Sequence, residues 1–190
     1  MSNHARILSQ SEFEQALETA KSSTYSNRDR LLLFLSHHGG MRVGEIASLR
    51  HSDVLTINHQ VKDIIRLSKA VTKGRQARDV MVSPVLAKEL ASFYAQHTDL
   101  DLKQFVIVNR YNRPFSSNAL SIHFLKLYDK AGLHDASSHS GRRGFITKLH
   151  HKGVPLRTIM ELVGHRQMST TQIYIDTDDA QKRNAVAMLE

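Results

Sequence analysis

Arg42 and Arg142 are two arginines that the local sequence places near the start of a helix. Arg42 stands in the segment GGMRVGEIASL, and Arg142 stands in HSGRRGF. A planar guanidinium stays charged and matches phosphate oxygens with paired hydrogen bonds. Two arginines on opposite sides of one phosphate would stabilise the charge that develops in a pentacoordinate transition state. The pair therefore predicts phosphodiester chemistry that relies on protein cations and requires no metal.

A metal site is the alternative that the 12 histidines raise, because His37-His38 and His150-His151 are adjacent pairs. Adjacent residues point apart on a helix, and no cysteine or regular carboxylate spacing completes a tetrahedral ligand set. We therefore expect no metal and no other cofactor. The lack of cysteine also excludes disulfides and thiol chemistry.

The charge balance favours a polyanionic partner. The chain has 26 Lys and Arg against 18 Asp and Glu, a net charge of +8 over 190 residues. Such a basic chain most simply pairs with nucleic acid. The N-terminus MSNHARILSQSEFEQAL has no charged region followed by an apolar one, and no apolar stretch approaches the roughly 18 residues that span a bilayer. We expect a cytoplasmic protein with no membrane partner.

The elements that must position these residues are mainly helices. Ser9 and Glu12 have capping-box spacing, which predicts a helix over residues 10–21. Residues 30–36 form a second apolar run that ends at Gly39-Gly40, and a helical period restarts at Val43, so Arg42 lies where one helix stops and another starts. Further helical segments are predicted over 84–97, 117–131, 140–152, 155–164, 169–175 and 179–189.

A small antiparallel sheet is predicted between Val54 and Val82. Its β-branched and apolar positions are separated by the turn-like Lys73-Gly74-Arg75, which places Lys73 near a hairpin. Residues 105–108 form a further short strand-like run. The class is mainly α with a small antiparallel β-sheet.

Five elements of the chain resemble the tyrosine recombinase family, the phage integrase-like enzymes. They are the segment from Gly40 to Leu49, the turn Thr72-Lys73-Gly74, His139-Ser-Gly-Arg142, Leu162-Val-Gly-His165 and Tyr174. Their order is the family's order, with 23 positions from Arg142 to His165 and nine from His165 to Tyr174. The resemblance covers roughly residues 10–185 and implies the catalytic-domain fold of that family.

The resemblance implies a catalytic role for each matching residue. Arg42 and Arg142 would clamp the scissile phosphate, and His165 would donate a further hydrogen bond to it. Tyr174 would attack phosphorus through its hydroxyl and leave a 3′-phosphotyrosyl link and a free 5′-hydroxyl. Taken alone, Tyr174 would be interpreted as a core aromatic between two isoleucines. Its distance from His165 is what favours the nucleophile.

Three more residues would support the reaction. Lys73 resembles the family's hairpin lysine, the general acid that protonates the departing 5′-oxygen. His139 resembles the residue that assists proton transfer at the tyrosine or the phosphate. Glu45, three residues after Arg42, matches an acidic position that orients neighbouring cations. A covalent link keeps the free energy of the phosphodiester, so a second 5′-hydroxyl can reverse the step without ATP.

Several cations near these residues would contact the DNA backbone, with ordinary solvated surface charges as the alternative. They are Lys69, Arg75, Arg78, Arg143 and Arg166.

One departure from the family pattern concerns packing. Gly141 stands where the family usually has Leu, which removes a packing side chain next to Arg142. We therefore expect a slightly less rigid site.

The resemblance is to short, single-domain members such as the recombinases that invert fimbrial promoter segments. We expect residues 1–190 to form one catalytic domain without the family's N-terminal DNA-clamping domain. The final segment, 178–190, would be either an intramolecular helix or one that docks into a neighbouring protomer.

The implied function is site-specific recombination of double-stranded DNA by a tetramer, near the nucleoid, with an accessory DNA-bending protein as a further partner. Integration, excision and inversion stay open. One alternative is a DNA-binding or regulatory module that has lost efficient catalysis. Another is a topoisomerase that relaxes supercoils as a monomer by the same chemistry.

Overall fold

The computed structural model describes residues 5–68, 77–96, 100–165, 167–172 and 187. Along these ranges the elements are α1 (Gln10–Lys21), α2 (Ser26–His37), α3 (Val43–Ser48), α4 (His51–Val54), β1 (Ile64–Leu67), β2 (Arg78–Met81), α5 (Pro84–Tyr94), α6 (Ser117–Lys130), α7 (Ser140–His151), α8 (Leu156–Val163) and α9 (Met168–Gln172). The mainly helical fold with a two-stranded antiparallel sheet confirms the predicted class.

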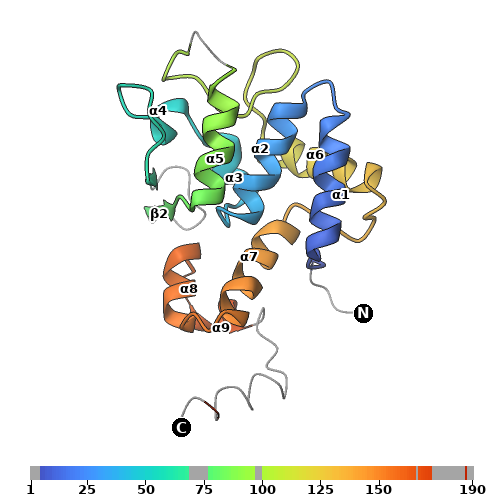
Figure 1. Ribbon diagram of the computed structural model, residues 1–190, viewed down its shortest axis with the longest axis vertical. Coiled ribbons are helices and arrows are strands. Elements are labelled where there is room, and N and C mark those ends of the chain that lie inside the picture. Colours follow the sequence, from blue (N-terminus) through green and yellow to red (C-terminus); the bar gives the residue numbers. More distant parts are fainter. Residues whose placement is uncertain (1–4, 69–76, 97–99, 166, 173–186, 188–190) are drawn as a thin grey trace.

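Helix α2 lies at the centre of the fold. Its residues 31–37 are all buried, so the helix is covered on every side rather than along one stripe. Helices α1, α5 and α7 pack against it, and Figure 1 shows them on different sides of α2. Gly39-Gly40 and Arg42 follow directly after this helix, so the packing of α2 in the core determines where Arg42 lies.

Helix α1 begins as the capping box predicted. The Ser9 hydroxyl accepts a hydrogen bond from the Glu12 N–H at 3.2 Å, and the Glu12 carboxylate accepts one from the Ser9 N–H at 2.8 Å. These two bonds satisfy N–H groups that a helix start otherwise leaves without partners. The predicted helix over residues 10–21 is confirmed.

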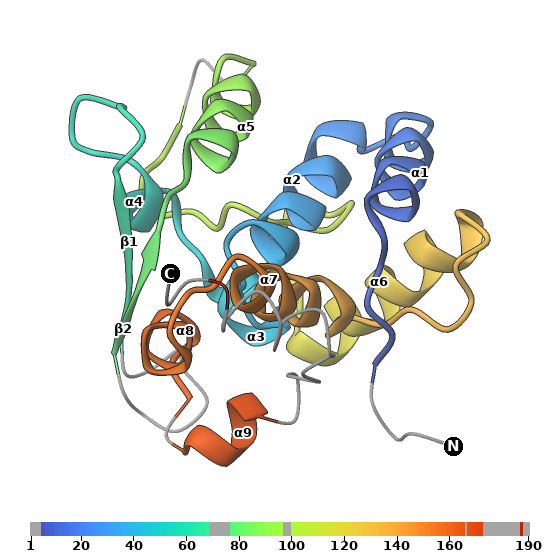
Figure 2. The same ribbon diagram turned by 60° about the horizontal axis from the view of Figure 1, so that its bottom comes forward.

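The two strands pair antiparallel as predicted, with Ile65 opposite Val80 and Leu67 opposite Arg78, while the predicted turn at Lys73 lies outside the described residues. Side chains alternate between faces of a strand, and here Arg78 and Val80 are buried while Asp79 and Met81 are exposed. Helix α8 packs against β2, as Figure 2 shows. Arg78 is thus a charged residue at an inward-facing position.

Other parts of the chain differ from the sequence prediction. Helix α4 was not expected, and α2 begins at Ser26 rather than at residue 30. The strand-like run over 105–108 makes only isolated bridges, Arg50 to Phe105 and Val108 to Pro114. Apart from Ala187, the predicted helix over 179–189 lies among residues that the structure does not describe.

Helix α7 approaches α2 closely at Gly141. A Cβ atom at this position would lie 2.3 Å from the Ser36 hydroxyl oxygen and 2.6 Å from Cδ2 of His37. The expectation that Gly141 loosens the site is wrong, because the missing side chain is what lets α7 pack tightly against α2. The neighbouring Arg142 is buried as a result.

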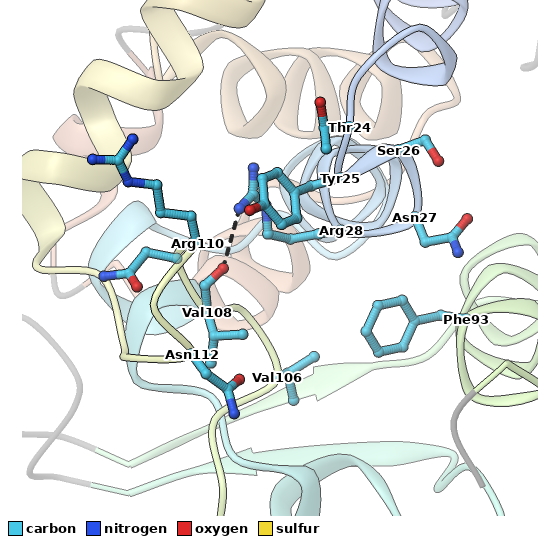
Figure 3. A pocket seen from close by; sticks show the side chains of 11 residues that line it. Thr24, Tyr25, Ser26, Asn27, Arg28, Phe93, Val106, Val108, Arg110 and Asn112 are labelled. Carbon is cyan, nitrogen blue, oxygen red and sulfur yellow. Dashed lines mark hydrogen bonds between the residues drawn. The ribbon is translucent and has the colours of Figure 1, made fainter.

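A hollow of about 390 Å³ lies at the other end of α2, lined by the residues before and at its start, by Phe93 and by the loop from Val106 to Asn112. In it the Arg28 guanidinium lies over the Tyr25 ring and donates to the Val108 carbonyl at 3.2 Å (Figure 3). Because Arg42 follows the C-terminal end of α2, this hollow is separate from the arginines of interest.

No helix within the described ranges combines the length and the apolar character that crossing a bilayer requires.

The packing of α7 yields a test that compares two glycines of the same helix. Gly141→Ala should lower the free energy of unfolding by about 1–3 kcal/mol, because the new methyl group overpacks the contact with α2. Gly144→Ala is the control, since its Cβ would meet only Ile7 at 3.9 Å, and alanine favours a helix by about 1 kcal/mol over glycine.

Denaturant unfolding monitored by circular dichroism measures both variants. Equal stability of the two would contradict the close approach of α7 and α2 at Gly141.

Candidate active site

Arg42 is fixed at the N-terminal cap of α3. Its backbone N–H donates to Oε2 of Glu45 at 2.8 Å, and its Nη1 donates to Oε1 of the same carboxylate at 3.0 Å. The residue before Met41 is Gly40, at φ +57, where a Cβ would lie 2.6 Å from the Phe145 ring. The turn that leads into α3 is therefore pressed against α7, which brings Arg42 beside Arg142's helix.

The Glu45 carboxylate lies between two arginines. Arg78 donates from Nε to Oε1 at 3.0 Å and from Nη2 to Oε2 at 2.6 Å, a two-pronged pairing. Only 1% of the Glu45 side chain is exposed. Burial raises the pKa of this carboxyl, but the hydrogen bond and charge of Arg78, with Arg42 and Arg142, outweigh it and hold the pKa below its usual value. Glu45 is thus a carboxylate at neutral pH.

Arg142 reaches the same region from the first turn of α7. Its Nη1 donates to the Gly40 carbonyl at 2.6 Å, and its Nη2 donates to the Val163 carbonyl. Both of these acceptors are neutral backbone carbonyls. This placement ties α7 to the turn before α3 and to the end of α8.

The C-terminal end of α8 receives all three arginines. The carbonyls of Leu162, Val163 and Gly164 accept from Arg78 (2.8 Å), Arg142 and Arg42 (3.1 Å) respectively. The last carbonyls of a helix have no partner within it and carry partial negative charge. The end of α8 therefore holds three guanidinium groups from three other elements in one place.

His165 follows directly after this helix end. Its Nδ1 lies 2.9 Å from the hydroxyl of Thr171, which is fully buried on α9. Burial and the positive charges of Arg142, Arg42 and Arg78 lower the pKa of His165 to about 4, against an opposing effect of Glu45. The imidazole is neutral at physiological pH and can donate one hydrogen bond.

The remaining predicted residues are less central or lie elsewhere. His139 is exposed at the N-terminal cap of α7. Arg143 is partly buried and donates to the Ala5 carbonyl at 2.6 Å. The residues that the structure does not describe include five predicted ones, Lys69, Lys73, Arg75, Arg166 and Tyr174.

Arg78 was predicted to contact the DNA backbone from the protein surface, but its side chain is buried. Only 6% of its side chain is exposed, against 19% for Arg42. The signal that could have found this was in the sequence, because Arg78 shares the period-two pattern of Val80 and Val82. The sequence prediction also missed Thr171, whose contact with His165 depends on how α9 folds back.

The histidine pair His37-His38 was the main metal alternative. His37 is a core ring whose Nε2 lies 3.1 Å from the Tyr128 hydroxyl, and burial, with the charges of His38 and Lys148, lowers its pKa to about 3. Among the residues that the structure describes, no cluster of three or more His, Cys, Asp or Glu side chains is placed to hold a metal ion.

The buried carboxylate yields a prediction about stability and pH. Glu45→Gln should lower the free energy of unfolding at pH 7 by about 3 kcal/mol, because Arg42 and Arg78 lose their buried counter-charge. A depressed pKa in the folded state stabilises the protein above the unfolded pKa, about 4.3, and this stabilisation is lost as pH falls through the folded pKa.

Urea unfolding between pH 3 and pH 7 measures the difference from wild type, which should shrink below about pH 4.3. Glu161→Gln serves as control, since its ion pair with Arg157 is exposed and should contribute little. A penalty for Glu45→Gln that stays constant down to pH 3 would contradict a buried, ionised Glu45.

Comparison with known proteins gives relatives along most of the chain. The model of the phage integrase family matches residues 6–181. Tyrosine recombinase XerA of Thermococcus onnurineus is 33% identical over 150 residues, which cover 77% of this chain and 50% of that protein. Tyrosine recombinase XerC of Listeria welshimeri is 29% identical over 157 residues, 80% of this chain and 50% of that protein. The chain thus spans about half the length of these curated relatives.

Solved structures agree with the fold. A crystal structure of XerA recombinase superimposes with a TM-score of 0.76 at 24% identity and covers all of this chain and 66% of that one. XerH site-specific recombinase, in a post-cleavage complex with a palindromic difH substrate, superimposes with a TM-score of 0.69 at 22% identity over 97% of this chain and 53% of that one. At these identities the likeness concerns the fold, while the family match extends over nearly the whole sequence. The chain belongs to the phage integrase family.

Proposed function

We propose that this chain carries the catalytic domain of a tyrosine-type site-specific recombinase, which cleaves and rejoins DNA through a 3′-phosphotyrosyl intermediate. The observation that carries the proposal is the convergence of Arg42, Arg142 and His165 at the end of α8. Two cations held by backbone carbonyls and a neutral donor held by the Thr171 hydroxyl are suited to one phosphate. The membership of the phage integrase family supports this reading.

The charges of the cluster suit the reaction. Arg42, Arg78 and Arg142 supply three positive charges and Glu45 one negative charge, which leaves two positive charges in excess. A phosphodiester carries one negative charge, and its pentacoordinate transition state carries two. Because the guanidinium groups are held before the substrate arrives, they need little reorganisation as the second charge develops.

The bonds exchange one for one in the proposed step. The Tyr174 hydroxyl oxygen attacks phosphorus, the bond to the 5′-oxygen breaks, and the phosphate stays joined to the tyrosine. Lys73 gives a proton to the departing 5′-oxygen, and His139 assists removal of the tyrosine proton. The roles of Tyr174 and Lys73 rest on the family's motif order, since both lie outside the described residues.

His165 acts in this scheme as a neutral donor. If the Thr171 hydroxyl donates to Nδ1, the ring proton is on Nε2 and can point to a phosphate oxygen. With a pKa of about 4, the imidazole keeps this form across the physiological range.

The wider function follows from the reaction. We propose double-stranded recombination sites as the substrate, a tetramer on DNA as the active assembly, and a location in the cytoplasm at the nucleoid, where the DNA lies. XerH is described in complex with a palindromic difH substrate, and the integrase of transposon Tn1549, which has a similar fold, in complex with transposon right end DNA; both support a DNA substrate. An accessory DNA-bending protein is a further proposed partner.

A covalent adduct tests the nucleophile. DNA duplexes selected by binding from a random pool, then nicked beside the selected site, should trap the wild-type protein as a denaturation-resistant adduct because the cut end diffuses away. Tyr174→Phe should form no adduct, since it lacks the attacking hydroxyl. Tyr111→Phe, an exposed tyrosine on a loop, should react like wild type.

Gel electrophoresis under denaturing conditions reads the result. Tight DNA binding without any wild-type adduct would favour the DNA-binding module instead. Relaxation of supercoiled plasmid by a monomer would favour a topoisomerase.

A second prediction concerns the ring form of His165. Thr171→Val keeps the shape of the side chain but removes the hydroxyl, so it should slow adduct formation by about tenfold or more. Thr171→Ser should restore most of the rate. Between pH 6 and pH 8 the single-turnover rate should depend on pH in the same way in wild type and in Thr171→Val, because His165 is already neutral there. A wild-type rate for Thr171→Val would remove Thr171 from the scheme.

A further inference from the structure

Arg78 joins three elements through one side chain. It starts from the inward face of β2, its two-pronged contact holds Glu45 on α3, and its Nη1 donates to the Leu162 carbonyl at the end of α8. Its charge is paired with the Glu45 carboxylate. Arg78 gives Nε and Nη2 to this carboxylate and Nη1 to a carbonyl, and only 6% of its side chain is exposed against 19% for Arg42, so it has less to offer a phosphate than Arg42 has.

Both oxygens of Glu45 are shared between Arg78 and Arg42. Oε1 accepts from Nε of Arg78 and from Nη1 of Arg42, each at 3.0 Å. Oε2 accepts from Nη2 of Arg78 at 2.6 Å and from the backbone N–H of Arg42 at 2.8 Å. The direction of the Glu45 carboxylate therefore depends on Arg78, and the direction of the Arg42 guanidinium depends on Glu45.

The aliphatic part of Arg78 packs against Gly164. A Cβ at Gly164, which has φ +63, would lie 2.7 Å from Cδ of Arg78. Gly164 is the residue whose carbonyl accepts from Nη2 of Arg42 and that directly precedes His165. Arg78 thus contacts both supports of Arg42, the carboxylate and the end of α8.

We infer that Arg78 is a positioning residue, which aligns Arg42 for the scissile phosphate by orienting Glu45 and by packing on Gly164, and does not itself contact DNA. The inference rests on the proposed recombinase function. A buried residue of β2 would thus affect the rate of the reaction without contacting the substrate.

The test compares Arg78→Ala with Arg30→Ala in single-turnover adduct formation. Arg30 also pairs with a buried glutamate, Glu89, whose two carboxylate oxygens both accept from Nε of Arg30, but that pair joins α2 to α5 away from α8. Arg78→Ala should slow adduct formation by about 100-fold with DNA affinity nearly unchanged, because misplacing a catalytic group has that effect. Arg30→Ala should keep the wild-type rate.

A substrate with an uncharged methylphosphonate at the cleavage position separates positioning from general stability. Its transition state has less negative charge and needs the Arg42 cation less, so the loss for Arg78→Ala should shrink to about tenfold or less. An equal loss on both substrates would mean that Arg78 only stabilises the fold, and the inference would fail.

An Arg42→Ala background separates positioning from direct contact. With no Arg42 left to align, Arg78→Ala should add little further loss. A full additional loss, or a weaker dependence of DNA affinity on salt by about one charge, would show that Arg78 contacts phosphate itself and would overturn the inference.

Arg78→Lys keeps the result decisive if the alanine variant does not fold. Lysine retains the charge next to Glu45, but one ammonium does not reproduce the planar fork together with the bond to Leu162. It should show the same pattern with a smaller loss, and a wild-type rate on phosphate would count against positioning. If the wild-type protein forms no adduct on either substrate, the proposed function fails rather than the role of Arg78.

Discussion

Burying the Glu45 carboxylate removes it from water at a cost of several kcal/mol, and the structure offsets this cost with two arginines from different parts of the chain. Each of the two carboxylate oxygens accepts one bond from Arg78 and one from Arg42. The positions of α3 and β2 relative to each other follow from this requirement. An isolated Glu45 or an isolated Arg78 in the same place would be strongly unfavourable.

The end of α8 supplies the second constraint. Its last carbonyls would otherwise lack partners in a partly buried region, and three guanidinium groups satisfy them. The same bonds fix the arginines in the absence of DNA, which is the condition that the proposed phosphate site requires. Since His165 is the next residue after Gly164, the end of α8 also determines the position of the His165 backbone.

The helical core sets the distances between these parts. Arg42 follows α2 through a glycine turn, and Arg142 comes from α7, which packs against α2 where Gly141 allows close approach. The site is therefore assembled by helix packing rather than by any one segment. A change at Gly141 or Gly40 would move one arginine relative to the other without touching either.

The sequence alone determined the features that depend on local interactions. The capping box at Ser9 specified α1, the glycine turn specified the start of α3, and β-branched residues specified the two strands, because each pattern involves groups only a few positions apart. The ordered motifs also indicated the family and the residues that would react, and the catalytic roles of all these residues stay predictions.

Tertiary structure decided what depends on partners distant in the sequence. Arg78 was expected at the surface, but its bonds go to Glu45, 33 positions away, and to Leu162, 84 positions away. Gly141 was expected to make the site less rigid. Instead, the absence of a side chain at Gly141 lets α7 pack closely against Ser36 on α2. No local pattern states which charge will meet which carboxylate, because that choice is made only when α3, β2 and α8 pack together.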